Sequence, residues 1–282
     1  MLVASRREAA LTARFLNPVT PMLEDLFLVL RAETDMALGR NAPARYGKPY
    51  PYGYCREITC DVLARLKARM ERPRHPGERA IKVYLKCGGT GRRVWGALRE
   101  RFFQNALQMG GLYIDVSNDT VDVNKPKVEI LPMDRSGFEK IRDAAHFARI
   151  GERYWGGRFY ANHALPSLAP LFPMIGVDFS GKARLHSPGK HMVDLFSGGD
   201  FVLSERWLEE GPAPSPAVVE EIRASCPVDL LQTNPVTSQA AALRACHLAR
   251  TERRASDPDW RAARIDDLLR LSKVSIPMLA RG

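Results

Sequence analysis

The chain has 282 residues, of which 45% are hydrophobic and 26% are charged. These proportions are typical of a soluble globular protein and exclude an intrinsically disordered one. The length is enough to bury a large core, in one large domain or two modest ones. A formal net charge of +10 favours an acidic partner, such as nucleic acid, an anionic membrane surface or a phosphorylated small molecule.

Sequence motifs, apolar segments and cysteine spacing narrow the choice of partner and location. No recognition helix, metal-finger spacing or aromatic-basic ribonucleoprotein motif accompanies the charge, so nucleic acid is an unlikely partner. No run approaches the ~20 apolar residues of a transmembrane segment, and the N-terminus lacks the apolar stretch of a signal peptide. The odd number of cysteines and the lack of a CxxC pair argue against a disulfide framework or a zinc site, and predict a cytoplasmic location. The cysteines are Cys55, Cys60, Cys87, Cys226 and Cys246.

The N-terminal part of the chain is predicted to be helical. Thr20 can cap a helix that has Pro21 at its first position, and Gly39 provides its stop. Proline, glycine and tyrosine then dominate residues 40–54, which cannot continue a helix and must form an ordered loop or an extended segment. A further helix with one apolar face is expected over residues 55–70.

A βαβ-like unit is predicted over residues 80–117. Its parts are a strand at 80–87, a glycine-rich turn, a helix at 92–109 and a strand at 111–117. A third strand at 127–131 follows too closely for another crossover helix. We therefore expect this third strand to pair antiparallel or to lie at a sheet edge.

The later part of the chain is predicted to be rich in helix. A helix is expected at 136–155, followed by an irregular, proline-punctuated stretch at 156–176 and a hairpin at 191–207. Two amphipathic helices, at 238–254 and 257–272, are expected near the C-terminus.

These elements predict a mixed α/β or α+β fold that is rich in helix. A small central sheet would contain the βαβ-like unit, with a helical lead-in before it and a helical C-terminal third after it. We expect a main domain over residues 1–210 and a helical extension over residues 211–282 packed on it. A single domain is the alternative.

Three glycines, Gly88, Gly89 and Gly91, lie between the first predicted strand and helix. In such a turn, glycines let backbone N–H groups approach phosphate oxygens, and the helix N-terminus adds a partial positive charge. Arg92 and Arg93 can add charge-assisted hydrogen bonds. The third glycine of the dinucleotide fingerprint and the Walker lysine are both missing. The pattern predicts a generic phosphate-binding loop, with a plain turn as the alternative.

The segment GGLYIDVSND resembles part of the metal-dependent glycosyltransferases that have the GT-A fold. The resemblance is confined to residues 101–119 and rests on an aliphatic run followed by Gly-Gly-x-Tyr-x-Asp. It implies that Asp115 holds Mn or Mg against the diphosphate of a sugar nucleotide, since hard cations prefer oxygen ligands. Ser117 stands where the family has its second aspartate, which leaves Asp119 or Asp122 as the partner ligand. A strand that ends in an Asn-Asp turn is the alternative.

Cys55, at the start of a predicted helix, resembles the nucleophile of papain-like and transglutaminase-like enzymes. The resemblance implies a thiol whose pKa is lowered by the helix dipole and by a nearby imidazole. Such enzymes need a later His followed by Asp or Asn, and this order is not met around Asp115. A buried structural cysteine is the alternative.

His163, next to Asn162 in the segment FYANHALP, is a candidate base on the acceptor side of a transfer reaction or part of a rigid pocket wall. The leading functional hypothesis is a transferase that uses a phosphate-bearing, nucleotide-type donor and is glycosyltransferase-like. One alternative is an acyltransferase or peptidase-like enzyme that depends on Cys55. The other is a non-enzymatic basic adaptor. The donor, the acceptor and the oligomeric state are left open.

Overall fold

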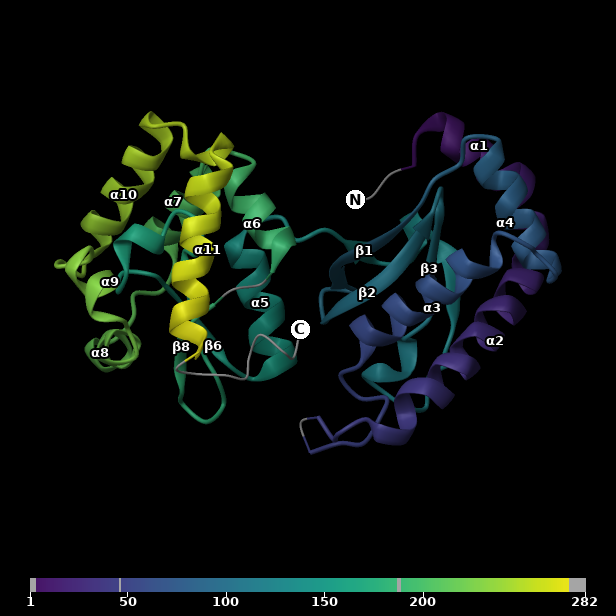
Figure 1. The fold of residues 1–282 in the computed structure, drawn as a ribbon, viewed down its shortest axis with the longest axis horizontal. Helices are drawn as coiled ribbons and strands as arrows, with labels where there is room; N and C mark the ends of the chain where they lie inside the picture. Colours follow the sequence, from purple (N-terminus) through teal and green to yellow (C-terminus); the bar gives the residue numbers. More distant parts are fainter. Residues whose placement is uncertain (1–3, 46, 187–188, 274–282) are drawn as a thin grey trace. The chain divides into compact units, whose positions relative to one another are not determined.

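Both helices and antiparallel sheets build the protein, so the predicted mixed, helix-rich fold class is confirmed (Figure 1). The N-terminal segment and the C-terminal third are helical, also as predicted. Within the described residues, no helix is long and apolar enough to cross a membrane. The structure is a computed structural model, and it describes residues 4–45, 47–186 and 189–273.

The chain divides into two compact units, Met1–Lys140 and Ile141–Gly282. This division differs from the expected one at residue 210. The helices that follow residue 210 belong to the same unit as the small sheet before them, because their buried side chains share one apolar core. That core includes Leu171 and Ile175 from before residue 210, and Ile222 and Leu268 from after it.

Unit 1 opens with α-helices whose ends follow from their sequence. The Ser5 side chain accepts a hydrogen bond from the Glu8 N–H, and the Glu8 carboxylate accepts one from the Ser5 N–H. Together they form a capping box at the start of the first helix. The second helix has a proline in its first turn and ends just before Gly39, as predicted. The helices are α1 (Arg6–Phe15), α2 (Thr20–Leu38), α3 (Cys55–Arg69) and α4 (Pro76–Lys86), with 3₁₀ helices at Asn17–Val19 and Gly39–Asn41.

An antiparallel sheet with strand order β4-β3-β2-β1-β5 completes unit 1. The third predicted strand is β4, which pairs antiparallel with β3 and lies at the sheet edge, as expected. The strands are β1 (Gly91–Leu98), β2 (Phe102–Met109), β3 (Leu112–Asp115), β4 (Glu129–Pro132) and β5 (Phe138–Glu139), with 3₁₀ helices at Asn118–Thr120 and Met133–Arg135.

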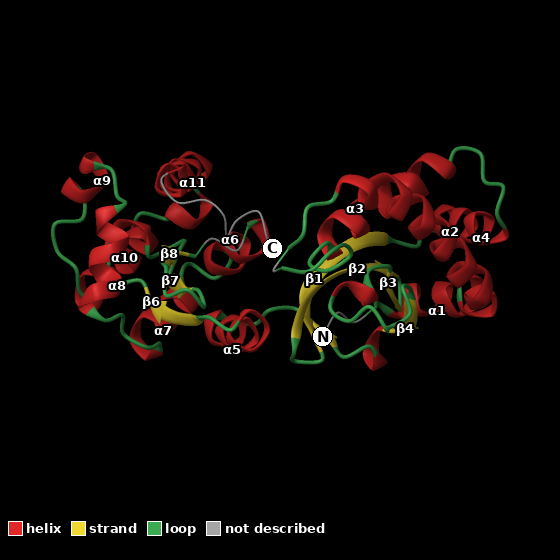
Figure 2. Ribbon diagram, turned by 90° about the horizontal axis from the view of Figure 1, so that it is seen from below, coloured by secondary structure: helices red, strands yellow, loops and turns green. Residues whose placement is uncertain are grey.

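Helices cover one face of this sheet, as Figure 2 shows for α2 and α3. Side chains alternate between the two faces of a strand, so Leu107 and Ile114 pack into the helical core, whereas Tyr113 packs with Phe138 on the other face. This alternation decides which polar side chains of β2 and β3 can meet.

The predicted βαβ-like unit over residues 80–117 is wrong at its first strand. Those residues belong to helix α4 instead. His75 and Glu78 form a capping box around Pro76, which occupies the first helical position. The signal for the start of α4 was therefore present in the sequence, in a proline-rich segment that is typical of a break between elements.

The predicted helix at 92–109 is also wrong, because this segment forms the β1–β2 hairpin. Arg99 and Glu100 make the turn with φ values of 53° and 54°. Glycine or asparagine normally occupies such left-handed positions, so the sequence carries no turn signal there.

Unit 2 surrounds a small antiparallel sheet of order β6-β7-β8 with helices. The hairpin predicted at 191–207 is wrong, since this segment forms α6 and α7, joined where Asp200 and Phe201 have positive φ. Strands β6 and β7 occupy part of the stretch expected to be irregular. The strands are β6 (Arg158–Ala161), β7 (Met174–Val177) and β8 (Ala183–Leu185). The helices are α5 (Ala144–Trp155), α6 (Lys190–Ser197), α7 (Val202–Glu210), α8 (Pro216–Ala224), α9 (Val228–Gln232), α10 (Gln239–Thr251) and α11 (Pro258–Lys273), with 3₁₀ helices at Pro166–Leu168 and Arg254–Ser256.

Candidate functional site

The glycine turn joins the C-terminus of α4 to β1, so its polarity is the reverse of the one expected for a phosphate loop. A helix C-terminus presents carbonyl oxygens and a partial negative charge, which disfavour phosphate. The turn also packs against the protein: a Cβ at Gly89 would lie 2.3 Å from the ring of Tyr84, and one at Gly88 would lie 2.5 Å from Arg7 Nη2. The glycines therefore serve close packing.

The chain also satisfies the polar groups of this turn. The backbone N–H of Thr90 donates to the hydroxyl of Tyr84 at 3.0 Å, and that hydroxyl donates to the carbonyl of Thr90 at 3.0 Å. The Thr90 hydroxyl bonds Glu8 of α1. Gly91 is the first residue of β1. An acidic side chain thus lies where the sequence predicted a phosphate.

Arg92 and Arg93 are consecutive residues of β1, so their side chains leave opposite faces of the strand. Arg92 donates from Nε and Nη2 to Gln108 Oε1, at 3.0 and 2.8 Å. Arg93 donates from Nη1 to the sulfur of Cys60 on α3. The two guanidinium groups therefore do not converge on one phosphate group.

Asp115 ends strand β3 and is fully buried. Its Oδ2 accepts from Gln104 Nε2 at 2.7 Å and from the Tyr113 hydroxyl at 3.0 Å, and its Oδ1 accepts from the backbone N–H and hydroxyl of Ser117 at 2.8 and 3.1 Å. Burial raises the pKa of Asp115 to about 6, although these hydrogen bonds favour the charged form. Each carboxylate oxygen is already occupied by donors from the chain.

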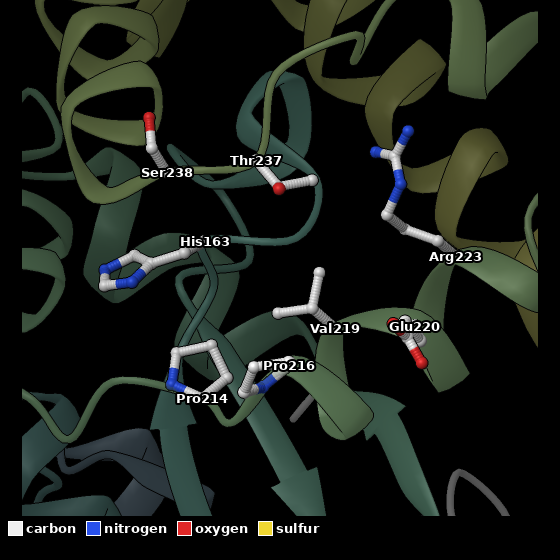
Figure 3. A pocket seen from close by; sticks show the side chains of 8 residues that line it. All are labelled: His163, Pro214, Pro216, Val219, Glu220, Arg223, Thr237 and Ser238. Carbon is white, nitrogen blue, oxygen red and sulfur yellow. The ribbon is translucent and has the colours of Figure 1, made fainter.

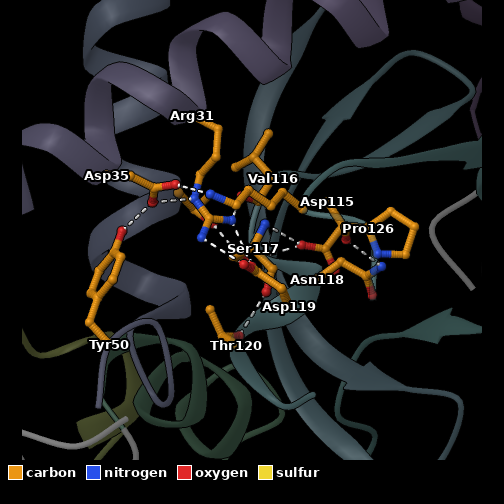
Figure 4. A network of polar contacts seen from close by, with 12 residues as sticks. Arg31, Asp35, Tyr50, Asp115, Val116, Ser117, Asn118, Asp119, Thr120 and Pro126 are labelled. Atoms are coloured by element: carbon orange, nitrogen blue, oxygen red, sulfur yellow. Dashed lines mark hydrogen bonds and ion pairs between the residues drawn. The ribbon is translucent and has the colours of Figure 1, made fainter. Parts of the chain in front are cut away.

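Asp119 lies in the 3₁₀ helix after β3 and is held by a different partner (Figure 4). Its Oδ1 lies 2.7 Å from Arg31 Nη1, and its Oδ2 lies 2.9 Å from Arg31 Nη2. Arg31 also donates from Nε to Asp35 at 2.7 Å. Because the strand ends at Asp115, the two aspartates do not continue along one strand face.

This geometry does not suit the Mn or Mg site predicted at Asp115 and Asp119. Each carboxylate already binds donors of its own, and a cation beside Asp119 would have to displace the Arg31 guanidinium. Across the described parts of the chain, no group of three or more His, Cys, Asp or Glu side chains is placed to hold a metal ion. The Asp115–Asp119 region is better explained as a structural network.

Cys55 is the first residue of α3, as predicted, but its thiol has an amide as neighbour instead of an imidazole. Asn105 Nδ2 on β2 lies 3.5 Å from the sulfur. Burial raises the pKa of the Cys55 thiol, which opposes formation of the nucleophilic thiolate. An amide cannot accept the thiol proton as a general base, so this arrangement gives no support to the thiol-dependent alternative.

His163 lines an open hollow in unit 2, as the pocket-wall interpretation anticipated (Figure 3). The residue is only 8% exposed, and its Nε2 lies 3.1 Å from the carbonyl of Leu208. Asn162 makes this wall rigid: its side chain accepts from the Leu165 N–H at 3.1 Å and donates to the Phe172 carbonyl at 2.9 Å. We call this cavity the His163–Arg223 hollow.

Arg223 of α8 brings positive charge to the same hollow. Its Nη1 donates to the carbonyls of Ala164 and Asn234, at 3.3 and 2.8 Å, which fixes the guanidinium in place. Within the described residues, Nε and Nη2 of Arg223 bind no acceptor of the chain. Thr237 and Ser238 add hydroxyl groups, and Ser238 is the N-cap of α10. The hollow thus combines a guanidinium with the positive end of a helix dipole.

The remaining lining gives the hollow an apolar wall and one opposing charge. Pro214, Pro216 and Val219 form the wall, and Glu220 is exposed at the rim. The volume is about 460 Å³, within the ~300–1,000 Å³ that small-molecule sites usually occupy. Its size and lining suit a small molecule with one anionic group.

Sequence reasoning found one residue of this hollow and missed the others. His163 stood out because imidazole chemistry draws attention to it, whereas Arg223 is one of many arginines on helices. The Ser238 cap before α10 was readable as a helix start. Nothing in the linear sequence joins positions 163, 223 and 238, because the fold alone brings these segments together.

Comparisons with known proteins add no family. No family model matches the sequence, and neither a curated protein nor a solved structure matches the chain significantly.

Proposed function

We propose that the chain binds a small phosphate-bearing molecule in the His163–Arg223 hollow and transfers a group from it to an acceptor. The observation that carries this proposal is the presence of the Arg223 guanidinium, the start of α10 and the His163 imidazole in one cavity. The donor class is the one that the sequence predicted. Its position is new, since the proposed site lies in unit 2 and not at the glycine turn.

The phosphate would bind at the Arg223 end of the hollow. A guanidinium that is already held by two carbonyls loses little side-chain entropy when a ligand binds, and it offers its remaining N–H groups to phosphate oxygens. The hydroxyl of Thr237, which lines the hollow between Arg223 and His163, adds a further donor (Figure 3).

His163 supports the transfer step. Its Nε2 is engaged by a carbonyl, so the neutral ring keeps a lone pair at Nδ1 that can accept a hydrogen bond from the bound molecule. An acceptor atom at one end of the hollow and a phosphate-binding cation at the other can hold a phosphate-bearing donor in one orientation for transfer. A sugar nucleotide belongs to the proposed donor class and serves as the probe for this hollow.

Calorimetric titration with UDP-glucose tests this function. We expect saturable binding to the wild-type protein, binding lost in Arg223→Gln, and binding kept in Arg92→Gln, which alters the strand beside the glycine turn. An assay for UDP release with glycerol as acceptor should then show turnover that His163→Ala abolishes. Binding that depends on Arg92 and not on Arg223 would return the site to unit 1 and contradict the proposal.

A further inference from the structure

The carbonyl of Leu208 fixes the proton of His163. Nε2 of His163 lies 3.1 Å from this oxygen, and a carbonyl can only accept, so Nε2 must carry the hydrogen. The same oxygen accepts from Gln239 Nε2 at 2.9 Å, which occupies its second lone pair. Since a neutral imidazole has one N–H group, Nδ1 of His163 is an acceptor.

This acceptor belongs to the hollow. His163 is more than nine-tenths buried, its ring is among the groups that line the cavity, and no described residue donates to Nδ1. A lone pair in this position repels a phosphate oxygen, because both are acceptors. In Figure 3, His163 and Arg223 lie at opposite ends of the hollow, with Val219 and Thr237 between them.

We infer that the molecule bound in the hollow carries a hydrogen-bond donor, a hydroxyl or N–H group, at the end away from its phosphate. This inference rests on the proposed function. The phosphate of this molecule lies at Arg223, and its hydroxyl or N–H group donates a hydrogen bond to Nδ1 of His163. The rest of the molecule lies against Pro214, Pro216 and Val219. An apolar wall of this kind suits a flat ring, which covers it without leaving polar groups unpaired. The hollow therefore selects hydroxylated or aminated phosphate esters over plain ones.

Calorimetric titrations with phenyl phosphate, 3-hydroxyphenyl phosphate and 4-hydroxyphenyl phosphate test the inference. They are run at pH 8, so that histidine side chains are neutral. At least one hydroxylated probe should bind the wild-type protein about five-fold more tightly than phenyl phosphate, which corresponds to one ordinary hydrogen bond. His163→Phe should bring this ratio close to one. His163→Gln, which keeps an acceptor, should retain part of the preference and serves as a second variant if His163→Phe does not fold.

The outcomes separate the inference from the proposed function. If phenyl phosphate binds but no hydroxylated probe binds more tightly, or if His163→Phe keeps the preference, the inference is overturned while the hollow remains a phosphate site. If none of the probes binds, the proposed function falls and the inference falls with it.

Discussion

Arg31 and Asp119 form a bidentate ion pair inside unit 1, with N–O distances of 2.7 and 2.9 Å. Both side chains are almost fully buried, and Arg31 also donates to the carbonyl of Val116 at 2.9 Å. Helix α2 is thereby tied to the segment that follows β3. The Asp119 carboxylate, which the sequence predicted as a metal ligand, instead joins these two segments by binding Arg31.

Removing the cation from this pair should destabilise the protein strongly. Arg31→Met leaves the buried Asp119 carboxylate unpaired, so we expect the free energy of unfolding of unit 1 to fall by about 3–5 kcal/mol. Urea unfolding followed by circular dichroism measures it. Arg65→Met is the matched control, since the Arg65–Asp61 pair is about 29% exposed and should contribute less than about 1 kcal/mol. Equal losses in the two variants would contradict the structural role of Arg31.

Asp115 should make stability depend on pH in the direction set by its raised pKa. The pKa is about 6 in the folded protein and 3.8 for an ordinary aspartate, so between these values the folded state holds a proton that the unfolded chain has lost. The stability from Asp115 is fully present below about pH 4 and is lost as the pH rises through 6. Relative to Asp115→Asn, the wild type should lose about 2–3 kcal/mol between pH 4 and pH 7.

The measurement is the difference in unfolding free energy between the wild type and Asp115→Asn at several pH values. The difference cancels the titration of other carboxylates. A difference that stays constant, or that grows in favour of the wild type as the pH rises, would show that folding does not raise the pKa of the Asp115 carboxyl group.

Cysteine labelling distinguishes a structural Cys55 from a reactive one. Burial raises the pKa of the Cys55 thiol and raises that of Cys246 to about 12, whereas Cys87 is exposed. Iodoacetamide at pH 7.5 should therefore modify the exposed Cys87 first, the half-buried Cys55 more slowly, and the buried Cys246 only when the protein unfolds. Peptide mass spectrometry over a time course gives the order. Labelling of Cys55 ahead of Cys87 would instead support the hypothesis of an enzyme that depends on Cys55.

Glu220 should weaken anion binding in the hollow because its charge has the wrong sign. Replacing it in Glu220→Gln should tighten the binding of phenyl phosphate by about two- to five-fold at low salt, and the gain should shrink as salt is added. Its neighbour Glu221 is exposed on the same helix and does not line the hollow, so Glu221→Gln is the control. An equal gain from both variants would point to general charge and not to the hollow.

The sequence predicted elements well where the signals for their ends were explicit. Helix α2 has Pro21 in its first turn and ends before Gly39 as predicted, although Val19, and not Thr20, occupies its N-cap position. Strand β3 lies inside the predicted strand. The hairpin β1–β2 was not predictable, because Arg99 and Glu100 adopt the left-handed conformation without glycine or asparagine. Helix α4 was predictable in principle, because His75, Pro76 and Glu78 have the spacing of a capping box.

The candidate site was less predictable because it depends on which side chains meet. Asp115 and Asp119 are four residues apart, yet the end of β3 between them gives each a separate set of partners. His163 and Arg223 are far apart in sequence and meet only through the fold of unit 2. Local patterns specify elements, whereas a site depends on long-range packing.

The most direct test of the central claim is a titration of phenyl phosphate into the wild type, Arg223→Gln and Arg206→Gln at one salt concentration. Arg206 is an exposed arginine of unit 2 outside the hollow, so it controls for the loss of net charge. We predict that Arg223→Gln weakens binding at least about ten-fold, the effect of losing charge-assisted hydrogen bonds. Arg206→Gln should stay within about two-fold of the wild type. Equal affinities for the wild type and Arg223→Gln would contradict a phosphate site in the His163–Arg223 hollow.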